Sequence, residues 1–382
     1  MFKKFRIRDY DFKLIFMVVA LSIIGAYAIG SAQPSLQSKQ FAGILGGILI
    51  MFVVSVFNYS FLLKFYWLMY ALNIGLLLGV MLAGVEGGLG AQRWFQIGGL
   101  RFQPSETAKI LLILFFAQFI MKYKEKLNKI WVVGICVVLI LIPWIMIFKQ
   151  PDLSTSVVVI VMFCVIMFAG GISYKYIFGV LIVAVPAFAM VIFLALKPDS
   201  DLLTEWQKNR IFSFINPQEY ALEEAYQQLN SVMAIGSGKM DGKGYKNNEI
   251  NSVKNGKFIS EAQTDFIFAV IGEEFGFKGC VVVILLLTGI SLECMSVARK
   301  AKDIAGRVIA AGFGGLVIFQ GFFNIGVATF ILPNTGLPLP FVSHGLTSLM
   351  SLYIGVGFVL SVKLQSPRRV KTQNIMLDWE SI

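Results

Sequence analysis

The sequence predicts an all-α polytopic membrane protein with about ten transmembrane helices. Of its 382 residues, 57% are hydrophobic and only 14% are charged, whereas a soluble domain carries about 25% charged residues. Apolar runs of about 20 residues, the length that spans a bilayer core of about 30 Å, recur along the chain. These two observations exclude a soluble globular domain, so the net charge of +11 matters mainly through where the basic residues lie.

The predicted spans begin close to the N-terminus. The first apolar run follows a basic segment, as in a signal peptide, but it exceeds the roughly 7–15 apolar residues of a signal peptide. We therefore expect it to be retained as the first helix. The ten spans are expected at 12–31, 41–58, 65–84, 105–121, 130–148, 154–170, 174–196, 279–297, 305–331 and 346–363.

The basic residues predict the orientation of these spans, because Lys and Arg collect in cytoplasmic connections. Nineteen of the 33 fall on one side, in clusters at 3–13, 122–129, 299–307 and 363–371 and singly at Lys64 and Lys175. Both termini are then cytoplasmic. The segment 197–278 becomes a large extracellular loop between the seventh and eighth spans, and 364–382 a cytoplasmic tail. The chain 1–382 is expected to form a single transmembrane domain.

Charged residues from several separate segments gather on the external side of this topology. They are Arg93 and Arg101 between the third and fourth spans, Glu106 and Lys109 at the start of the fourth, Asp152 at the start of the sixth, and Arg210 and Asp265 in the long loop. Helix N-termini and arginines both favour anionic oxygens, phosphate above all. The sequence therefore predicts a polar cavity that opens outward and accepts an anion.

Asp265 is the most unusual of these charges. It directly precedes the apolar run 266–271, so its carboxylate is expected at the membrane surface or in a cleft. A charge in such a place is costly and is a functional-site hypothesis by default. The alternative is a helix cap or a partner of a nearby lysine. Glu273 and Glu274, which follow it, are adjacent and cannot share a helix face, so structural roles are favoured for them.

The other charges also have structural alternatives. Glu106 and Lys109 are three residues apart, and such a pair within one helix contributes a few tenths of a kcal/mol, about 0.2–0.5. Asp152 is placed to complement a helix dipole, and Arg93 and Arg101 are placed to anchor to lipid headgroups. The residues alone leave open whether each of these side chains, and the arginine of the long loop, contacts a ligand.

Three further features carry less weight. The glycine-rich stretch 236–244, with Lys243, does not match the strand–GxxxxGK[ST]–helix pattern of a nucleotide-binding loop. His344 is the single histidine, so it cannot build a zinc site, and a hydrogen-bonded loop residue is the favoured reading. The four cysteines lie in apolar runs and are expected to pack there. No residue is assigned to a metal, and neither an organic cofactor nor a nucleic-acid partner is expected.

The chain resembles the SEDS family (shape, elongation, division and sporulation) of bacterial cell-wall glycosyltransferases over essentially its whole length. Each matching motif is short, and their order along the chain makes the set specific. The motifs are Gln92-Arg93-Trp94, Arg101-Phe102-Gln103-Pro104-Ser105-Glu106 with Lys109, Lys149-Gln150-Pro151-Asp152-Leu153, Asn209-Arg210, Ile235-Gly236-Ser237-Gly238 with Gly242-Lys243-Gly244, Glu261-Ala262-Gln263-Thr264-Asp265-Phe266-Ile267-Phe268, Glu273-Glu274-Phe275-Gly276 and Pro338-Leu339-Pro340-Phe341-Val342-Ser343.

The resemblance implies a peptidoglycan glycosyltransferase that polymerises lipid II at the outer face of the cytoplasmic membrane, beside a class B penicillin-binding protein. The family's proposed catalytic aspartate falls on Asp265. The motif 335–340 is similar to that of the elongation (RodA) branch rather than the division (FtsW) branch. One departure bears on this assignment, since the family usually has Ser-Tyr-Gly-Gly where this chain has Ser343-His344-Gly345-Leu346.

The residues fit the chemistry that the resemblance implies. Inverting glycosyl transfer needs a base for the acceptor hydroxyl, a role open to Asp265, and cationic help for a departing diphosphate. Arg93, Arg101, Lys109 and Arg210 are the candidates for holding the diphosphate. A divalent cation, Mg²⁺ or Mn²⁺, that joins a carboxylate such as Asp152 to phosphate is the open alternative.

Two other classes of function remain in view. A flippase or other transporter of a lipid-linked precursor would share the anionic cavity, but transporters place coupling charges near the midplane. Here the charges cluster at one face. A scaffold that only recruits a partner synthase would need fewer external charges. A division or sporulation polymerase of the same family is the remaining alternative to the elongation role.

Overall fold

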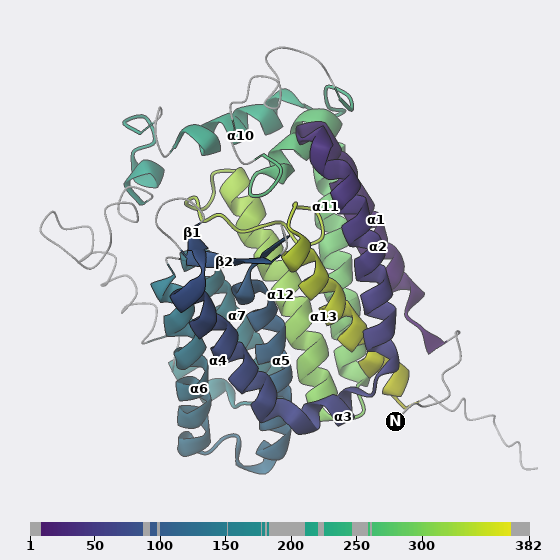
Figure 1. The fold of residues 1–382 in the computed structure, drawn as a ribbon, viewed down its shortest axis with the longest axis vertical. Helices are drawn as coiled ribbons and strands as arrows, with labels where there is room; N and C mark the ends of the chain where they lie inside the picture. The colour runs from purple at the N-terminus through teal and green to yellow at the C-terminus, as the bar shows by residue number, and fades with distance from the viewer. Residues whose placement is uncertain are drawn as a thin grey trace, which may run out of the picture.

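The computed structural model of the chain is a bundle of long helices with smaller elements at one end (Figure 1). In the part of the chain that the structure describes, nine helices are long and apolar enough to cross a membrane, which confirms an all-α polytopic fold. The predicted seventh span, 174–196, falls largely outside that part, as does Arg210. The described residues are 9–86, 92–97, 100–150, 152–176, 178–179, 182, 211–220, 225–246, 259 and 262–367.

Most helices match the predicted spans within a few residues, with two exceptions. The helices are α1 (Phe12–Ala32), α2 (Pro34–Val56), α3 (Tyr59–Leu62), α4 (Tyr66–Ala83), α5 (Pro104–Lys122), α6 (Ile130–Lys149), α7 (Leu153–Gly170), α10 (Tyr226–Ser237), α11 (Ile267–Lys300), α12 (Ile304–Ala328) and α13 (Leu346–Gln365). The second span was expected to begin at 41 and the eighth at 279. Helix α2 begins earlier because its first turns, 34–40, carry polar residues that an apolar-run criterion leaves out. Helix α11 begins earlier because the polar residues Glu273, Glu274 and Lys278 separate its apolar first turn from the predicted span.

Helix starts follow the local sequence. The side chains of Asp11, Asp152 and Asp303 each accept a hydrogen bond from a backbone amide in the first turn of α1, α7 and α12. Such caps satisfy amides that have no partner inside the helix. Pro34 and Pro104 stand at the first position of α2 and α5, where a missing amide hydrogen costs nothing.

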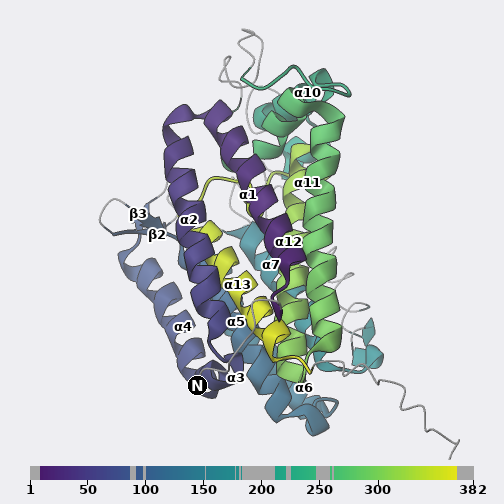
Figure 2. The same cartoon turned by 90° about the vertical axis from the view of Figure 1, so that its right-hand side faces the viewer.

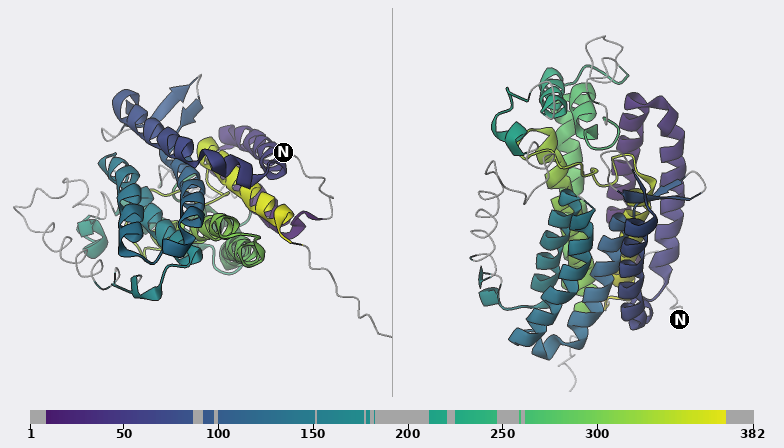
Figure 3. Two further views of the ribbon diagram at one scale, coloured as in Figure 1. Left: turned by 90° about the horizontal axis from the view of Figure 1, so that it is seen from below. Right: turned by 60° about the vertical axis from the view of Figure 1, so that its left-hand side comes forward.

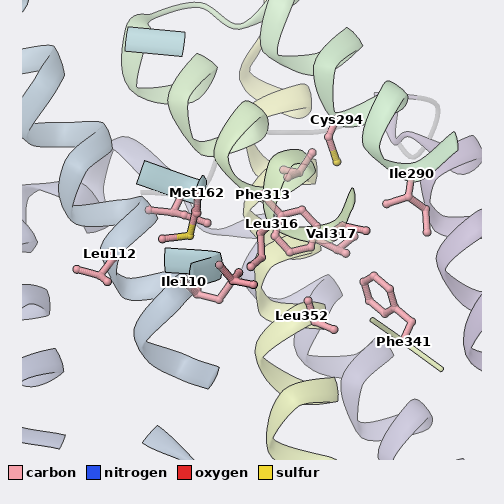
Figure 4. Packing of buried hydrophobic residues seen from close by; sticks show 14 of the residues in the cluster. Ile110, Leu112, Met162, Ile290, Cys294, Phe313, Leu316, Val317, Phe341 and Leu352 are labelled. Carbon is pink, nitrogen blue, oxygen red and sulfur yellow. The ribbon is translucent and has the colours of Figure 1, made fainter. Parts of the chain in front are cut away.

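Helix α12 is the centre of the bundle, and α5, α7, α11 and α13 pack around it. Phe313, Leu316 and Val317 of α12 meet Ile110 of α5 and Met162 of α7 in the buried core (Figure 4). A side chain in place of Gly315 would lie 2.9 Å from Val165, so the small residue permits close approach of α12 and α7. Helices α1 and α2 form a hairpin beside α11 and α13 (Figure 2).

The connection between α4 and α5 contains a small antiparallel sheet, which was not among the elements predicted from the sequence. Its strands are β1 (Val85–Glu86), β2 (Gln92–Ile97) and β3 (Leu100–Phe102), in the order β1-β2-β3. The sheet lies beside the end of α4 at the edge of the bundle (Figure 3). The signal in the sequence was Arg-Trp-Phe-Gln-Ile followed by Gly-Gly, a short alternating run and a tight turn.

The two ends of the bundle differ in composition. The α5–α6, α11–α12 and α2–α3 turns and the end of α13 lie together at the lower end in Figure 1. They carry the basic clusters around 122–129 and 299–307. Hydrogen bonds from Ser173 and Tyr176 to Asn128 place the residues after α7 at that end too. The opposite end holds the sheet, α10 and the start of α11.

Candidate active site

The α12–α13 connection, residues 329–345, is the segment around which the candidate site is built. Its backbone is irregular, with no helix or strand, yet much of it is buried. Irregular backbone inside a membrane protein is tolerated where protein groups satisfy its polar atoms. Side chains from three helices do so here: Gln228 of α10 bonds to Leu332 O, Ser154 of α7 to Thr335 O, Gln320 of α12 to Pro338 O and Asn324 of α12 to Leu337 O.

Asp265 lies against this connection, immediately before α11, and its side chain is half-buried. The Nδ2 amide of Asn324 donates both to the carbonyl of Asp265, at 2.7 Å, and to that of Leu337, at 2.6 Å. Gly336 has a φ of +73°, and a Cβ there would stand 3.2 Å from the Oδ2 of Asp265. The carboxylate therefore lies over a glycine that leaves it room.

The backbone just before Asp265 is also fixed. Ser343 donates its hydroxyl to the carbonyl of Thr264 and accepts from the amide of Leu339, while the amide of His344 donates to the carbonyl of Gln263 at 2.9 Å. The segment 263–265 is therefore bonded along its length to the α12–α13 connection. This arrangement restricts where the carboxylate can point.

His344 has a second contact on its side chain. Its Nδ1 lies 3.1 Å from the Oε1 of Gln40, a buried residue of α2. Burial, together with the charge of Lys39, lowers the pKa of His344 below its ordinary value. The imidazole is accordingly a neutral hydrogen-bonding group near pH 7, as the sequence predicted for a loop residue.

Glu106 and Lys109 form an ion pair inside the bundle rather than at its surface. The Nζ of Lys109 lies 2.7 Å from Glu106 Oε1, with side chains only 2% and 3% exposed. Lys109 also donates to Gln320 at 2.8 Å, and Gln320 donates to the carbonyl of Pro338 at 2.9 Å. Ser348 donates to the other oxygen of Glu106 at 2.6 Å. The pair thus supports the α12–α13 connection from α5.

Asp152 reaches the same connection through its helix. Its Oδ1 accepts from the amide of Thr155 at 3.1 Å, and its Oδ2 from the hydroxyl of Thr155 at 2.9 Å and from Gln103 at 3.5 Å. Ser154, in the turn that Asp152 caps, donates to the carbonyl of Thr335. Asp152 therefore caps the N-terminus of α7, where the sequence offered a helix-dipole role as its structural alternative.

Arg93 and Arg101, the two predicted site arginines that the structure describes, belong to the sheet. Arg93 of β2 donates its Nε to the carbonyl of Gln150 at the end of α6, at 2.7 Å. Arg101 of β3 is exposed, and its carbonyl accepts from Thr347 of α13 at 2.9 Å. The sheet is thereby held to α6 and to α13, and it carries positive charge beside the start of α5.

The structure connects most of the predicted residues through one segment. Asp265, Glu106, Lys109 and the turn after Asp152 all contact the α12–α13 connection or a residue bonded to it. The sequence reasoning missed Gln320 and Asn324. These two amides are four residues apart in an otherwise apolar helix, hence on one face, and polar groups within a membrane helix are a functional signal.

Comparison with known proteins places the chain. Residues 10–368 match the family described as "Cell cycle protein", which is that of FtsW, RodA and SpoVE. The chain belongs to the SEDS family. This SEDS chain is 33% identical over 357 residues to the peptidoglycan glycosyltransferase MrdB of Escherichia coli (strain K12), covering 92% of this chain and 93% of MrdB. It is 32% identical over 375 residues to the probable peptidoglycan glycosyltransferase FtsW of Geobacter metallireducens, covering 93% and 95%.

Solved structures agree. The SEDS chain superposes with a TM-score of 0.76 on a chain of a peptidoglycan synthase complex that is described as coordinating polymerization and crosslinking. The two chains are 28% identical, and the superposition covers 93% of this chain and 97% of the other. The rod shape determining protein RodA of Thermus thermophilus superposes with a TM-score of 0.69 and is 27% identical, and the superposition covers 94% of this chain and 98% of RodA. The predicted family, the fold class, the multi-pass membrane character and the enzyme class, peptidoglycan glycosyltransferase, are confirmed.

Proposed function

We propose that this SEDS chain polymerises lipid II into glycan strands at the outer face of the cytoplasmic membrane, with Asp265 as the general base. The single observation that carries this proposal is the placement of Asp265. Its carboxylate lies over Gly336, and its backbone is bonded by Asn324 of α12 and preceded by residues bonded to Ser343 and His344. A base that is held in this way is pre-oriented for proton transfer.

In this mechanism Asp265 takes the proton from a hydroxyl of the acceptor sugar. The hydroxyl oxygen forms the new glycosidic bond at the anomeric carbon of the donor, on the face opposite the leaving group. The bond from that carbon to the diphosphate breaks, and undecaprenyl diphosphate departs with the electron pair. A correctly placed general base contributes about 10²–10⁴-fold to such a step.

The departing diphosphate needs positive charge nearby. Arg101 is exposed on β3, and Arg93 is on the neighbouring strand. We propose that these two arginines bind the diphosphate together with Arg210, which lies outside the described residues. Lys109 is 1% exposed and is paired with Glu106 and Gln320. Lys109 therefore supports the structure of the site. Asp152, whose side-chain oxygens cap α7, also has a supporting role.

A divalent cation is a separate part of the proposal. In the described portion of the chain, no three His, Cys, Asp or Glu side chains come together as a metal site. Mg²⁺ or Mn²⁺ bound here would need most of its oxygen ligands from the diphosphate, with Asp265 or Asp152 as the protein carboxylate. When bound, the ion would neutralise charge on the leaving group. Loss of polymerisation in EDTA, restored by Mg²⁺ or Mn²⁺, would support this role.

The orientation in the membrane is inferred from the charge at the two ends. The connections rich in Lys and Arg lie at the end opposite α10 and the start of α11, which Asp265 precedes (Figure 1). By the positive-inside rule, that end and both termini are cytoplasmic. The Asp265 end then faces outward, where a lipid-linked precursor displayed on the outer leaflet can reach it.

The partner and the process rest on similarity. One structural relative is part of a peptidoglycan synthase complex, which supports a class B penicillin-binding protein as the partner of this chain. The motif Thr335–Pro340 favours work with the elongation machinery, as in RodA, while division-type FtsW relatives of similar identity keep that alternative open.

The test is polymerisation of lipid II by the purified chain with its transpeptidase partner. We expect Asp265→Asn to lower the rate by at least about 100-fold while the complex still forms, because the base is lost. Glu125→Gln, an exposed carboxylate at the opposite end, is the matched control and should keep the wild-type rate. Wild-type translocation of lipid II across vesicles without polymer would support a flippase instead.

A further inference from the structure

Helix α11 is interrupted at Gly276, a short distance after Asp265. Gly276 has φ +63° and ψ −161°, a conformation that only glycine adopts readily. In a continuous helix the amides of Phe277 and Lys278 would bond to the carbonyls of Glu273 and Glu274. Instead they donate to the carbonyls of Lys239, at 2.8 Å, and Met240, at 3.3 Å.

The glycine turn, residues 238–246, takes the place of the missing helical bonds. The carbonyls of Glu273 and Glu274 accept from the amides of Lys243, at 2.9 Å, and Gly244, at 3.1 Å. The turn thus exchanges backbone hydrogen bonds with both sides of the break. This segment, which follows α10 across the end of the bundle (Figures 1 and 2), is bonded into α11.

Two glycines of the turn lie so close to the backbone of α11 that no side chain fits there. A Cβ on Gly238 would lie 1.9 Å from the carbonyl oxygen of Gly272, and one on Gly242, which has φ +80°, would lie 2.2 Å from that of Glu274. Neither contact is with a flexible side chain, so neither can be relieved cheaply. A Cβ on Gly236, at the end of α10, would meet nothing within 4 Å.

Charged side chains reinforce the same joint. The Nζ of Lys243 lies 2.9 Å from Glu273 Oε1, and the side chain of Glu273 is only 4% exposed. Glu274 accepts from the amide of Lys246 at 3.2 Å and from the hydroxyl of Ser31 at the end of α1. The part of α11 before the break, residues 267–275, is therefore held by the turn and by α1. Asp265 lies two residues before this part of the helix.

We propose that the glycine turn is a positioning element for the reaction: it fixes the direction of residues 267–275 and so holds the carboxylate of Asp265, with Lys243 and Glu273 as positioning residues. This inference rests on the proposed function, since it takes Asp265 to be the base. A displacement of about 1 Å of a reacting group is enough to lower a rate about 100-fold. The competing account is that the turn only stabilises the fold.

The first experiment compares Gly242→Ala with Gly236→Ala, the same substitution where there is space. Polymerisation by the complex with the partner is measured as a function of lipid II concentration. We expect Gly242→Ala to lower kcat at least about tenfold with KM within about twofold, and Gly236→Ala to match wild type. A folded Gly242→Ala variant with the wild-type kcat overturns the proposal, as does a loss confined to thermal stability.

A second pair of variants decides the question if Gly242→Ala does not fold. Lys243→Met removes the ion pair to Glu273 and leaves the backbone of the turn in place. We expect kcat to fall about threefold to tenfold with the melting temperature within a few degrees, and Lys243→Arg, which keeps the charge, to restore it. An unchanged kcat in Lys243→Met, or equal losses in Lys243→Met and Lys243→Arg, overturns the proposal.

Asp265→Asn is measured in parallel so that two failures can be told apart. If Asp265→Asn keeps the wild-type rate, the proposed function fails and the turn has no base to position. If Asp265→Asn is inactive while the turn variants keep the wild-type kcat, the proposed function stands and the positioning role fails.

Discussion

Each end of the bundle holds a buried acidic group paired with a lysine, and the two pairs are built differently. At the basic end, Asp11 and Lys363 lie 3.3 Å apart, the lysine is 26% exposed, and Asp11 also caps its own helix. At the Asp265 end, Glu106 and Lys109 lie 2.7 Å apart, both are nearly unexposed, and each bonds to another helix. The first pair closes a helix terminus, whereas the second supports a distant connection.

The difference shows how this fold separates anchoring from chemistry. Polar bonds at the basic end hold helix termini, within a helix and between helices: Asp303 caps α12 and bonds to Tyr59, and Asn58 caps α3. At the other end they hold the irregular backbone around Asp265, such as Gln320 with Pro338 and Ser343 with Thr264. Removing a group from the second set should lower activity, whether or not stability falls as well, and removing one from the first set should lower stability alone.

The largest effect is expected for Lys109→Met. It leaves Glu106 buried without its cation, which costs about 3–5 kcal/mol in comparable pairs, and it frees Gln320 from one partner. Polymerisation should be abolished and the melting temperature in detergent lowered. Lys363→Met at the other end is the comparison, with a smaller change in melting temperature and a rate within about twofold of wild type. Equal losses of activity in the two variants would contradict the proposal that the two ends of the bundle have different roles.

Asn324→Leu should have the next largest effect. The substitution conserves approximate volume but removes the amide that bonds to the carbonyls of Asp265 and Leu337. Leaving such buried groups without a donor costs about 1–3 kcal/mol. We expect kcat to fall at least about tenfold while KM changes little. Steady-state kinetics with lipid II measures both, and a rate equal to wild type would show that Asp265 needs no support from α12.

A smaller effect, and on stability only, is expected for Asp303→Ala. Asp303 accepts from the amide of Gly306 at 2.7 Å and from the hydroxyl of Tyr59 at 2.9 Å, both at the basic end. Loss of a cap of this kind costs about 1 kcal/mol. The melting temperature should fall by a few degrees while the polymerisation rate stays at the wild-type value. A tenfold loss of rate would mean that the basic end also shapes the site.

The smallest effect concerns His344 and pH. Burial and Lys39 lower the pKa of His344, so the unfolded chain binds a proton at a higher pH than the folded chain does. The free energy of unfolding should therefore decrease as pH falls below about 6.5, and the contribution should be fully present above that value. His344→Tyr removes this dependence. Thermal unfolding at pH 5.5 and 8 measures it, and identical shifts in both proteins would contradict it.

Much of this architecture could be predicted from the sequence, because a bilayer imposes length and polarity on each helix. Apolar runs located most spans, basic clusters separated the two ends, and the carboxylate of Asp265 before an apolar run indicated the site. The identity of hydrogen-bond partners could not be predicted. Gln320 and Asn324 bond to backbone carbonyls of the α12–α13 connection, and nothing local in the sequence specifies those contacts.

The start of α11 shows the same limit. Helix α11 is broken at Gly276, and the glycine turn, some 30 residues earlier in the chain, supplies hydrogen bonds to the backbone on both sides of the break. Similarly, the sequence placed Lys109 near the outer surface but could not show that its ammonium turns inward to Glu106 and Gln320. Contacts between residues far apart in sequence determine both the break in α11 and the direction of the Lys109 side chain.

The same conservative substitution, Asp to Asn, can be made at each end of the bundle, and comparing the two variants tests most directly where the reaction takes place. Asp265→Asn and Asp11→Asn are compared for lipid II polymerisation in complex with the transpeptidase partner; asparagine still caps a helix, so Asp11→Asn should keep its fold. We predict a loss of at least about 100-fold for Asp265→Asn and a rate within about twofold of wild type for Asp11→Asn. Wild-type polymerisation by a folded Asp265→Asn variant would contradict the assignment of the reaction to this end of the bundle.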